Sequence, residues 1–147
     1  MIEMAESNNR MVVSLEDLLA QADALRKEID ALQKLRDEIA ESLNAARSAK
    51  EAINLIKGQG KDLMLSADRR GFVLLKVTEI PSSKVLVNLG LGYYAEMEPD
   101  QASKILEERE EQLNKSLQEI TARLNNAVNA YTQIAEILNR AQQQQGE

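Results

Sequence analysis

Hydrophobic residues recur at alternating steps of three and four along two segments of nearly equal length, residues 14–57 and 100–143. This spacing is the heptad pattern of helices that pack side by side in a coiled coil, with apolar side chains at positions a and d. Between them, residues 61–98 carry short apolar runs separated by glycine, proline and charged residues, which favours strands and tight turns. The chain is therefore predicted to be mainly α with a small β insert, as a long antiparallel two-helix coiled coil whose arms are joined by two β-hairpins.

The first arm is predicted to begin at Ser14. Its hydroxyl can accept a hydrogen bond from a free amide of the first helical turn, and Glu16 and Asp17 place negative charge where the helix dipole favours it. The arm is predicted to end at Lys57, just before glycines that are typical of helix ends. Residues 1–13 are expected to form an N-terminal tail.

The stripe of a and d positions, which we call the seam, is aliphatic along most of the first arm. Its charged members are Arg36 and Lys50, both at a positions. Such side chains usually reach water along their aliphatic stems, so they weaken a seam and restrict the register that a partner helix can adopt. The aliphatic members are Leu15, Leu18, Ala22, Leu25, Ile29, Leu32, Ile39, Leu43, Ala46 and Ile53.

The second arm is predicted to begin after Pro99, with Asp100 as its cap, because proline disfavours helix at the residue before it. Its outer face carries acidic residues, including Glu107 and Glu110, which we interpret as a solvated helix surface. Residues 144–147 are expected to be a fraying tail. The seam of this arm runs without interruption through Leu113, Leu117, Ile120, Leu124, Ala127, Tyr131, Ile134, Leu138 and Ala141.

Four strands are predicted in the insert, over Asp62–Ala67, Phe72–Glu79, Lys84–Leu89 and Tyr93–Met97. Short connections join neighbouring antiparallel strands, so these form two successive hairpins. The second strand is apolar on both faces and needs cover that arms leading away from the sheet do not supply. We therefore expect an obligate oligomer in which hairpins of several subunits close a β-barrel. The expected assembly residues are Leu63, Leu65, Phe72, Leu74, Val77, Val85, Val87, Leu89 and Tyr93.

Composition excludes several classes of function. The formal net charge of −6 argues against binding of nucleic acid, which requires a basic surface. The chain has no Cys and no His, so it lacks disulfides, thiolate chemistry and the usual base at neutral pH; we expect no enzyme, no cofactor and no metal. No apolar run approaches the roughly 20 residues of a membrane span, and the first residues are too polar for a secretory signal. We expect no membrane contact and a cytoplasmic location.

The order of these elements resembles the prefoldin family, specifically its α-type subunits. The likeness covers essentially the whole chain, residues 1–147, as a single domain. It is carried most specifically by Lys84-Val85-Leu86-Val87-Asn88-Leu89-Gly90-Leu91-Gly92-Tyr93-Tyr94-Ala95-Glu96, which looks like the family's last hairpin and is followed by a capped helix. The first hairpin departs from the family's usual proline and glycine-rich pattern, because Leu65-Ser66-Ala67-Asp68-Arg69-Arg70-Gly71 stands there.

The resemblance implies a molecular chaperone subunit, an ATP-independent holdase that captures unfolded proteins at the coiled-coil tips and passes them to a group II chaperonin in archaeal or eukaryotic cytosol. It also implies a hetero-hexamer of two alpha-type and four beta-type subunits. For Leu15, Leu18, Ile134 and Leu138, closure of the seam is an equal alternative to client contact. The expected client-binding residues are Met4, Met11, Val12, Val13, Leu15, Leu18, Leu19, Ile134, Ile137 and Leu138.

A different class of function also fits the residues. A barrel-forming insert can polymerise head to tail, which would make the chain a coiled-coil structural spacer or filament-forming scaffold without chaperone transfer. An enzyme ranks behind both hypotheses, because acid–base chemistry needs converging groups in an enclosed site and these carboxylates lie along open helices. Protection of an unfolded client and the formation of long homopolymers are the observations that separate the first two hypotheses.

Overall fold

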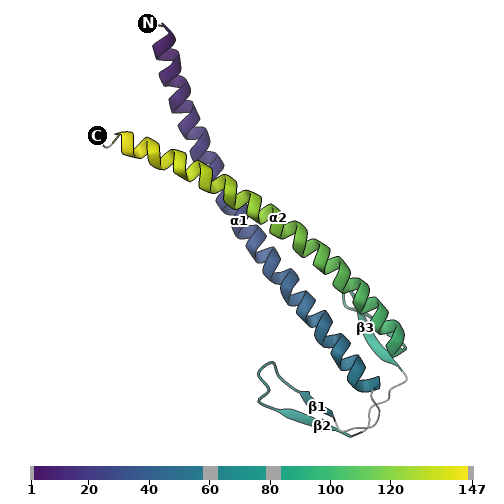
Figure 1. The fold of residues 1–147 in the computed structure, drawn as a ribbon. Helices are drawn as coiled ribbons and strands as arrows, with labels where there is room; N and C mark the ends of the chain where they lie inside the picture. Colours follow the sequence, from purple (N-terminus) through teal and green to yellow (C-terminus); the bar gives the residue numbers. More distant parts are fainter. Residues whose placement is uncertain (1, 58–62, 79–83, 146–147) are drawn as a thin grey trace. The chain divides into compact units, whose positions relative to one another are not determined.

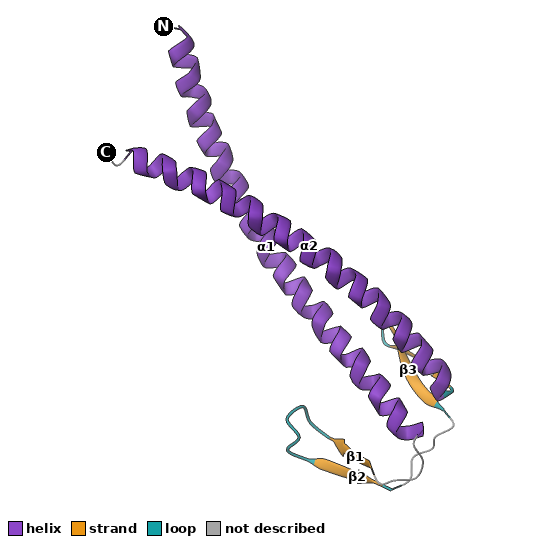
Figure 2. Cartoon of the chain, in the orientation of Figure 1, coloured by secondary structure: helices purple, strands orange, loops and turns teal. Residues whose placement is uncertain are grey.

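The computed structural model describes residues 2–57, 63–78 and 84–145, with the backbone alone for residues 2–14 and 145. It contains helix α1 (Ile2–Lys57), strands β1 (Leu63–Ser66), β2 (Leu74–Val77), β3 (Val85–Gly90) and β4 (Tyr93–Met97), and helix α2 (Pro99–Gln145). Strands β1 and β2 form one antiparallel hairpin and β3 and β4 another (Figure 1, Figure 2). The predicted fold class is confirmed. Over the described part of this single chain, neither sheet closes into a barrel.

Helix α1 begins at Ile2, so the predicted start at Ser14 is wrong. The segment before Ser14 contains neither proline nor glycine, and nothing in its sequence opposes the continuation of the helix towards the N-terminus. Ser14 therefore lies within the helix and does not cap it. Helix α2 begins at Pro99, and Asp100 stands in its first turn. The glycines expected to end α1, and the predicted strand ends Asp62 and Glu79, lie outside the described residues.

The chain contains two compact units, of which the first consists of residues 1–40 and 115–147. Its core lies between the two helices and is made of residues at predicted a and d positions, so the heptad register is confirmed in this unit. Each fully buried aliphatic anchor contributes about 1.5–3 kcal/mol. The buried members are Leu32, Ile120, Leu124 and Ala127, and Leu25, Ile29 and Ile39 pack against them.

The second unit, residues 41–114, has its core where hairpin β3–β4 packs against both helices. The strand register pairs Val85 with Met97 and Val87 with Ala95. Because directly paired residues project to the same face of a sheet, one side of this hairpin is wholly apolar. Its neighbours on the helices include Ala102, which is 0% exposed and whose small side chain permits close approach. The buried cluster consists of Ile53, Val87, Met97, Ala102 and Leu106.

The two charged seam residues of α1 have different surroundings. Arg36 stays half exposed, and its Nε lies 3.8 Å from Oδ1 of Asp37 on the same helix. Lys50 reaches across to α2, where its Nζ lies 3.6 Å from Oε1 of Glu110 and 3.7 Å from Oε1 of Glu107. The assignment of the α2 carboxylates to a solvated outer face is wrong for Glu110, because this residue stands at an a position and is half buried.

The loop between β1 and β2 is organised by the carboxylate of Asp68. Its Oδ1 accepts hydrogen bonds from the backbone N–H of Arg70 at 2.8 Å and of Phe72 at 3.1 Å, and its Oδ2 accepts one from Val73 at 2.9 Å. Gly71 completes the turn with a φ of 72°, a conformation that costs glycine little. The amides of Phe72, Val73 and Arg70 hold the pKa of Asp68 below its usual value, because they stabilise the ionised carboxylate.

Replacement of Asp68 by Ala is expected to loosen this loop and leave the helices unchanged. The three amides lose their acceptor, so their hydrogen exchange measured by NMR accelerates. In the unchanged chain the same loss is expected at low pH. Because folding lowers the pKa of Asp68, its stabilising contribution is complete above the unfolded value of about 3.9 and disappears as the pH falls through the lower folded value. Asp17→Ala, at an exposed helical position, is the control; equal exchange in both variants would contradict the role of Asp68.

Candidate functional site

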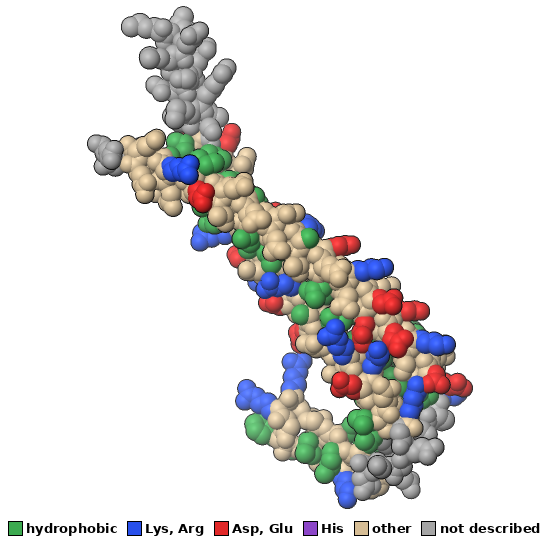
Figure 3. Space-filling view, viewed as in Figure 1, with side chains coloured by type: hydrophobic (Ala, Val, Ile, Leu, Met, Phe, Trp, Pro, Cys, Tyr) green, Lys and Arg blue, Asp and Glu red, His purple; other side chains and the backbone are tan. Residues whose placement is uncertain are grey.

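Most of the exposed large hydrophobic residues in the described part of the chain lie in the two hairpins, and several stand free on hairpin β1–β2 (Figure 3). The register of this hairpin pairs Leu63 with Val77 and Leu65 with Leu75. These four residues therefore share one side of the sheet, which we call the aliphatic face. Leu65 and Leu75 are 52% and 53% exposed, and Leu63 and Val77 are half buried.

The opposite side of hairpin β1–β2 is also largely apolar. It carries Met64 paired with Lys76, and Ser66 paired with Leu74, and both Met64 and Leu74 are exposed. Phe72, at the end of the Asp68 loop, is 81% exposed. The sheet has two strands, so within the described chain each strand has an edge with no neighbouring strand. Free edges and apolar faces of this kind are the features through which strands pair with other chains.

Hairpin β3–β4 is different, because its own chain covers one side of it. The predicted assembly residues Val85 and Val87 face the core of the second unit, and Val87 is buried there. Leu89 and Tyr93, from the same prediction, are exposed. The sequence pattern did not indicate which hairpin the helices cover, since apolar residues occur in the strands of both. The small residues Ala49 and Ala102 could have indicated that hairpin β3–β4 is the covered one, because they leave room on the helices for a packed strand.

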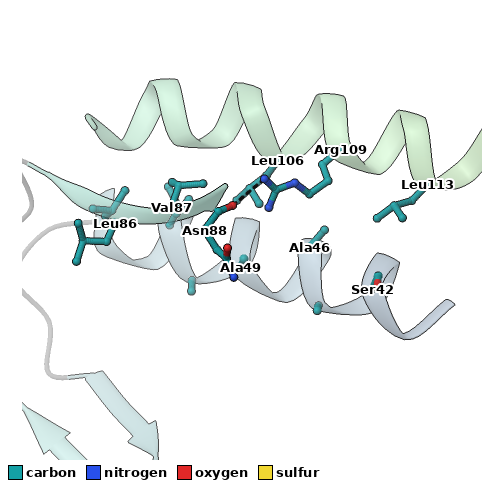
Figure 4. A pocket seen from close by; sticks show the side chains of 13 residues that line it. Ser42, Ala46, Ala49, Leu86, Val87, Asn88, Leu106, Arg109 and Leu113 are labelled. Carbon is teal, nitrogen blue, oxygen red and sulfur yellow. Dashed lines mark hydrogen bonds between the residues drawn. The ribbon is translucent and has the colours of Figure 1, made fainter. Parts of the chain in front are cut away.

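A groove of about 630 Å³ runs along this packed hairpin in the second unit, and Figure 4 shows the side chains that line it. Its α1 wall is made mostly of small residues, among them Ser42, Ala46 and Ala49. Arg109 of α2 donates a hydrogen bond from Nη2 to the backbone carbonyl of Asn88 at 2.8 Å, which ties the end of β3 to the helix. No sequence pattern marks Arg109 for this contact, because its partner is a backbone carbonyl.

The turn of this hairpin presents an exposed leucine. Leu91 is 98% exposed and adopts a φ of 56°, in the left-handed region, between Gly90 and Gly92, which also have positive φ. The side-chain Oδ1 of Asn88 accepts a hydrogen bond from the Gly90 N–H at 2.8 Å and fixes the start of the turn. The β3–β4 register shifts between Asn88 and Gly90, so the hairpin ends in a bulge.

The apolar residues near the free ends of the helices form a second candidate surface in the first unit. Leu19 and Ile137 lie off the seam and are 58% and 48% exposed. Leu15, Leu18, Ile134 and Leu138 are half buried, whereas seam residues such as Leu32 and Leu124 are buried. We call these six residues, 15, 18, 19, 134, 137 and 138, the arm-end residues. The side chains of Met4, Met11, Val12 and Val13 lie outside the described part.

Metal-binding clusters and membrane-spanning helices are both absent from the described residues. These residues include no group of three or more acidic residues placed to hold a metal ion. No helix in the same part of the chain is long and apolar enough to cross a membrane.

A long pair of helices that pack through heptads, with two small hairpins between them and exposed strand edges, defines a class of coiled-coil subunits that assemble through their sheets. The family model described as Prefoldin subunit matches residues 11–144. The chain belongs to the prefoldin family, as an archaeal alpha-type subunit. This membership gives it a chaperone role within prefoldin complexes.

Individual relatives agree with this assignment. The chain is 97% identical over 144 residues to prefoldin subunit alpha of Metallosphaera sedula, covering 98% of this chain and 100% of that one. It is 45% identical to the alpha subunit of Saccharolobus islandicus, over 92% of this chain and 95% of the relative. Among solved structures, a filamentous PFD from Methanocaldococcus jannaschii aligns with a TM-score of 0.60 at 16% identity, over 82% of this chain and 98% of that chain, which shows a shared fold.

Proposed function

We propose that the chain is the alpha-type subunit of an ATP-independent holdase that captures unfolded proteins with its arm-end residues. The observation that carries the proposal is the exposure of Leu19 and Ile137, two apolar residues off the seam near the free ends of the helices. The seam residues Leu15, Leu18 and Leu138 beside them are half buried. Apolar side chains that stay accessible beside the exposed Leu19 and Ile137 can make weak contacts with many apolar segments.

Within this proposal, assembly uses hairpin β1–β2. Its aliphatic face and its two free strand edges support pairing with hairpins of beta-type subunits, in a complex of two alpha and four beta chains. Leu63, Leu65, Phe72, Leu74 and Val77 belong to this proposed surface. Val85 and Val87 are left out of it, because their own chain covers them. A cytoplasmic location and delivery of the client to a group II chaperonin complete the proposal.

The double variant Leu19→Ser/Ile137→Ser tests client capture. Each serine removes an exposed apolar anchor, so about tenfold more complex is expected to be needed for half-maximal protection of a client. The complex is assembled with a beta-type subunit, its mass is checked, and light scattering is followed after dilution of a chemically unfolded client without ATP. The matched control is Leu35→Ser/Val128→Ser, at two exposed apolar positions of the same helices away from their free ends.

Equal protection by both assembled variants would overturn the assignment of the arm-end residues. Absence of client protection by the unchanged complex would overturn the proposal that the complex is a holdase. The scaffold alternative is favoured by one observation, namely that hairpin β1–β2 offers apolar residues on both sides and so can accept neighbours on each. Electron microscopy of the chain alone decides it, since a scaffold forms long polymers whereas a subunit of a closed complex does not.

A further inference from the structure

A mixed charge cluster lies in the otherwise aliphatic seam of the second unit. The cluster consists of Lys50 on α1 with Glu107 and Glu110 on α2. The Lys50 side chain is 28% exposed and that of Glu110 is 19% exposed, so both side chains are half buried at the edge of the seam. Glu107 is more exposed and adds a second carboxylate at the rim. Removal of two ions from water is costly, so such a pair is poor evidence for stability and better evidence for specificity.

The heptad positions of the charged residues favour one alignment of the two helices. Lys50 occupies an a position of α1, and Glu110 occupies an a position of α2, one heptad before Leu117. A second pair of the same polarity follows one heptad further along α1, where Lys57 contacts Asp100 at the start of α2. In both pairs the cation stands on α1 and the anion on α2. A single alignment of the two helices satisfies both pairs.

A slip of one heptad, about 10.5 Å along the helix, breaks this match in either direction. If α2 slides one way, Glu110 comes opposite Leu43, the residue one heptad before Lys50. If it slides the other way, Lys50 comes opposite Leu117. Each slip leaves one ion opposite a leucine and without a partner, Glu110 in the first case and Lys50 in the second, while the other ion meets Asp100 or Lys57 of the second pair. The unpaired ion is then less favourably placed than in the native alignment.

Pairing of like arms from two copies of the chain is opposed in the same way. Two α1 helices in parallel register place Lys50 against Lys50, and two α2 helices place Glu110 against Glu110, because equivalent a positions meet in a parallel coiled coil. The aliphatic seam residues do not discriminate among these arrangements, since leucine packs against leucine in all of them. The discrimination therefore rests on the charged positions.

We infer that Lys50 and Glu110, supported by Glu107, select the pairing and the register of the arms, so that an α1 arm pairs with an α2 arm in one alignment and not with the α1 arm of a second copy. The inference goes beyond client capture and does not depend on it. The two residues act on helix pairing and contact no ligand. Substitution of these two residues is expected to change which positions of α1 and α2 face each other across the seam. A loss of stability alone does not cause such a change.

Because the chain has no cysteine, pairs of introduced cysteines can report the register by cross-linking. Glu28 and Arg123 face each other across the helices, with Oε1 and Nη2 3.8 Å apart. In full-length chain assembled with a beta-type subunit, Glu28→Cys/Arg123→Cys treated with a short bismaleimide reports the native register. Glu28→Cys/Ser116→Cys and Glu28→Cys/Ala130→Cys report slips of one heptad each way. A cross-linked dimer of the chain on a denaturing gel reports exchange between copies.

In the unchanged seam, the native cross-link is expected to dominate. Lys50→Glu is expected to lower the ratio of native to slipped and interchain products about fivefold, and the charge exchange Lys50→Glu/Glu110→Lys to restore most of it. Lys50→Leu/Glu110→Leu is the decisive variant, because it is expected to raise the thermal midpoint and still lower the same ratio. An unchanged ratio in Lys50→Glu and in the double leucine variant would overturn the inference. Lys27→Glu, at an exposed position of α1, is the control.

Discussion

The double variant Leu65→Lys/Leu75→Lys is expected to abolish assembly of the chain with a beta-type subunit. The two leucines are opposite each other on the aliphatic face of hairpin β1–β2 and are about half exposed in the single chain. If a neighbouring subunit covers this face, two ammonium groups without partners must be buried at the contact, at a cost of several kcal/mol each. Native mass spectrometry at fixed subunit concentration is expected to show free chains in place of the complex.

The same lysine substitution at an exposed helical leucine is the control for this result. Leu55 of α1 is 62% exposed and lies outside the hairpins, so Leu55→Lys is expected to assemble normally. Helical content measured by circular dichroism should match in both variants, because neither changes the seam. A complex of unchanged mass formed by the Leu65→Lys/Leu75→Lys chain would show that subunits meet elsewhere, and would direct attention to the exposed Leu89, Leu91 and Tyr93 of the second hairpin.

The second large effect is expected from Leu124→Ala in the seam of the first unit. Leu124 is buried with Leu32, Ile120 and Ala127, and its truncation leaves a cavity in the buried core of the first unit. We expect a loss of about 2–5 kcal/mol in the free energy of unfolding, measured by chemical denaturation at one fixed protein concentration. Val128→Ala, at a neighbouring exposed position of the same helix, is expected to cost below about 1 kcal/mol. Similar costs for the two variants would contradict the assigned register.

The seam was predictable from the sequence because it is a local and repeated signal. Every a and d position from Leu15 to Ile53 and from Leu113 to Ala141 is buried or half buried, including Arg36 and Lys50. Each heptad gives the same information again, so one atypical residue does not destroy the pattern. The strands were predictable to within a few residues because short runs of residues typical of turns bound them.

Contacts between distant segments were not predictable in this way. The packing of Val87 against Ala102 and Leu106 depends on where a hairpin folds back, and alternation within β3 carries no information about that. The pairing of Lys50 with Glu110 depends on the alignment of two arms separated by the whole insert. The start of α1 at Ile2 was missed for the opposite reason, because a plausible cap at Ser14 was read as a boundary where the helix continues.

The two free edges of hairpin β1–β2 have a consequence for the synthesis of the protein. A newly made chain carries its apolar faces and unpaired strand edges from the moment this hairpin forms, before any partner covers them. Edge-to-edge association with other unfinished copies then competes with correct assembly, and the competition grows with the square of the concentration of unassembled chains. If this hairpin is the assembly surface, a cell that makes the subunit in excess of its partners is expected to accumulate chains that aggregate, so balanced synthesis of the subunits is expected to favour its expression.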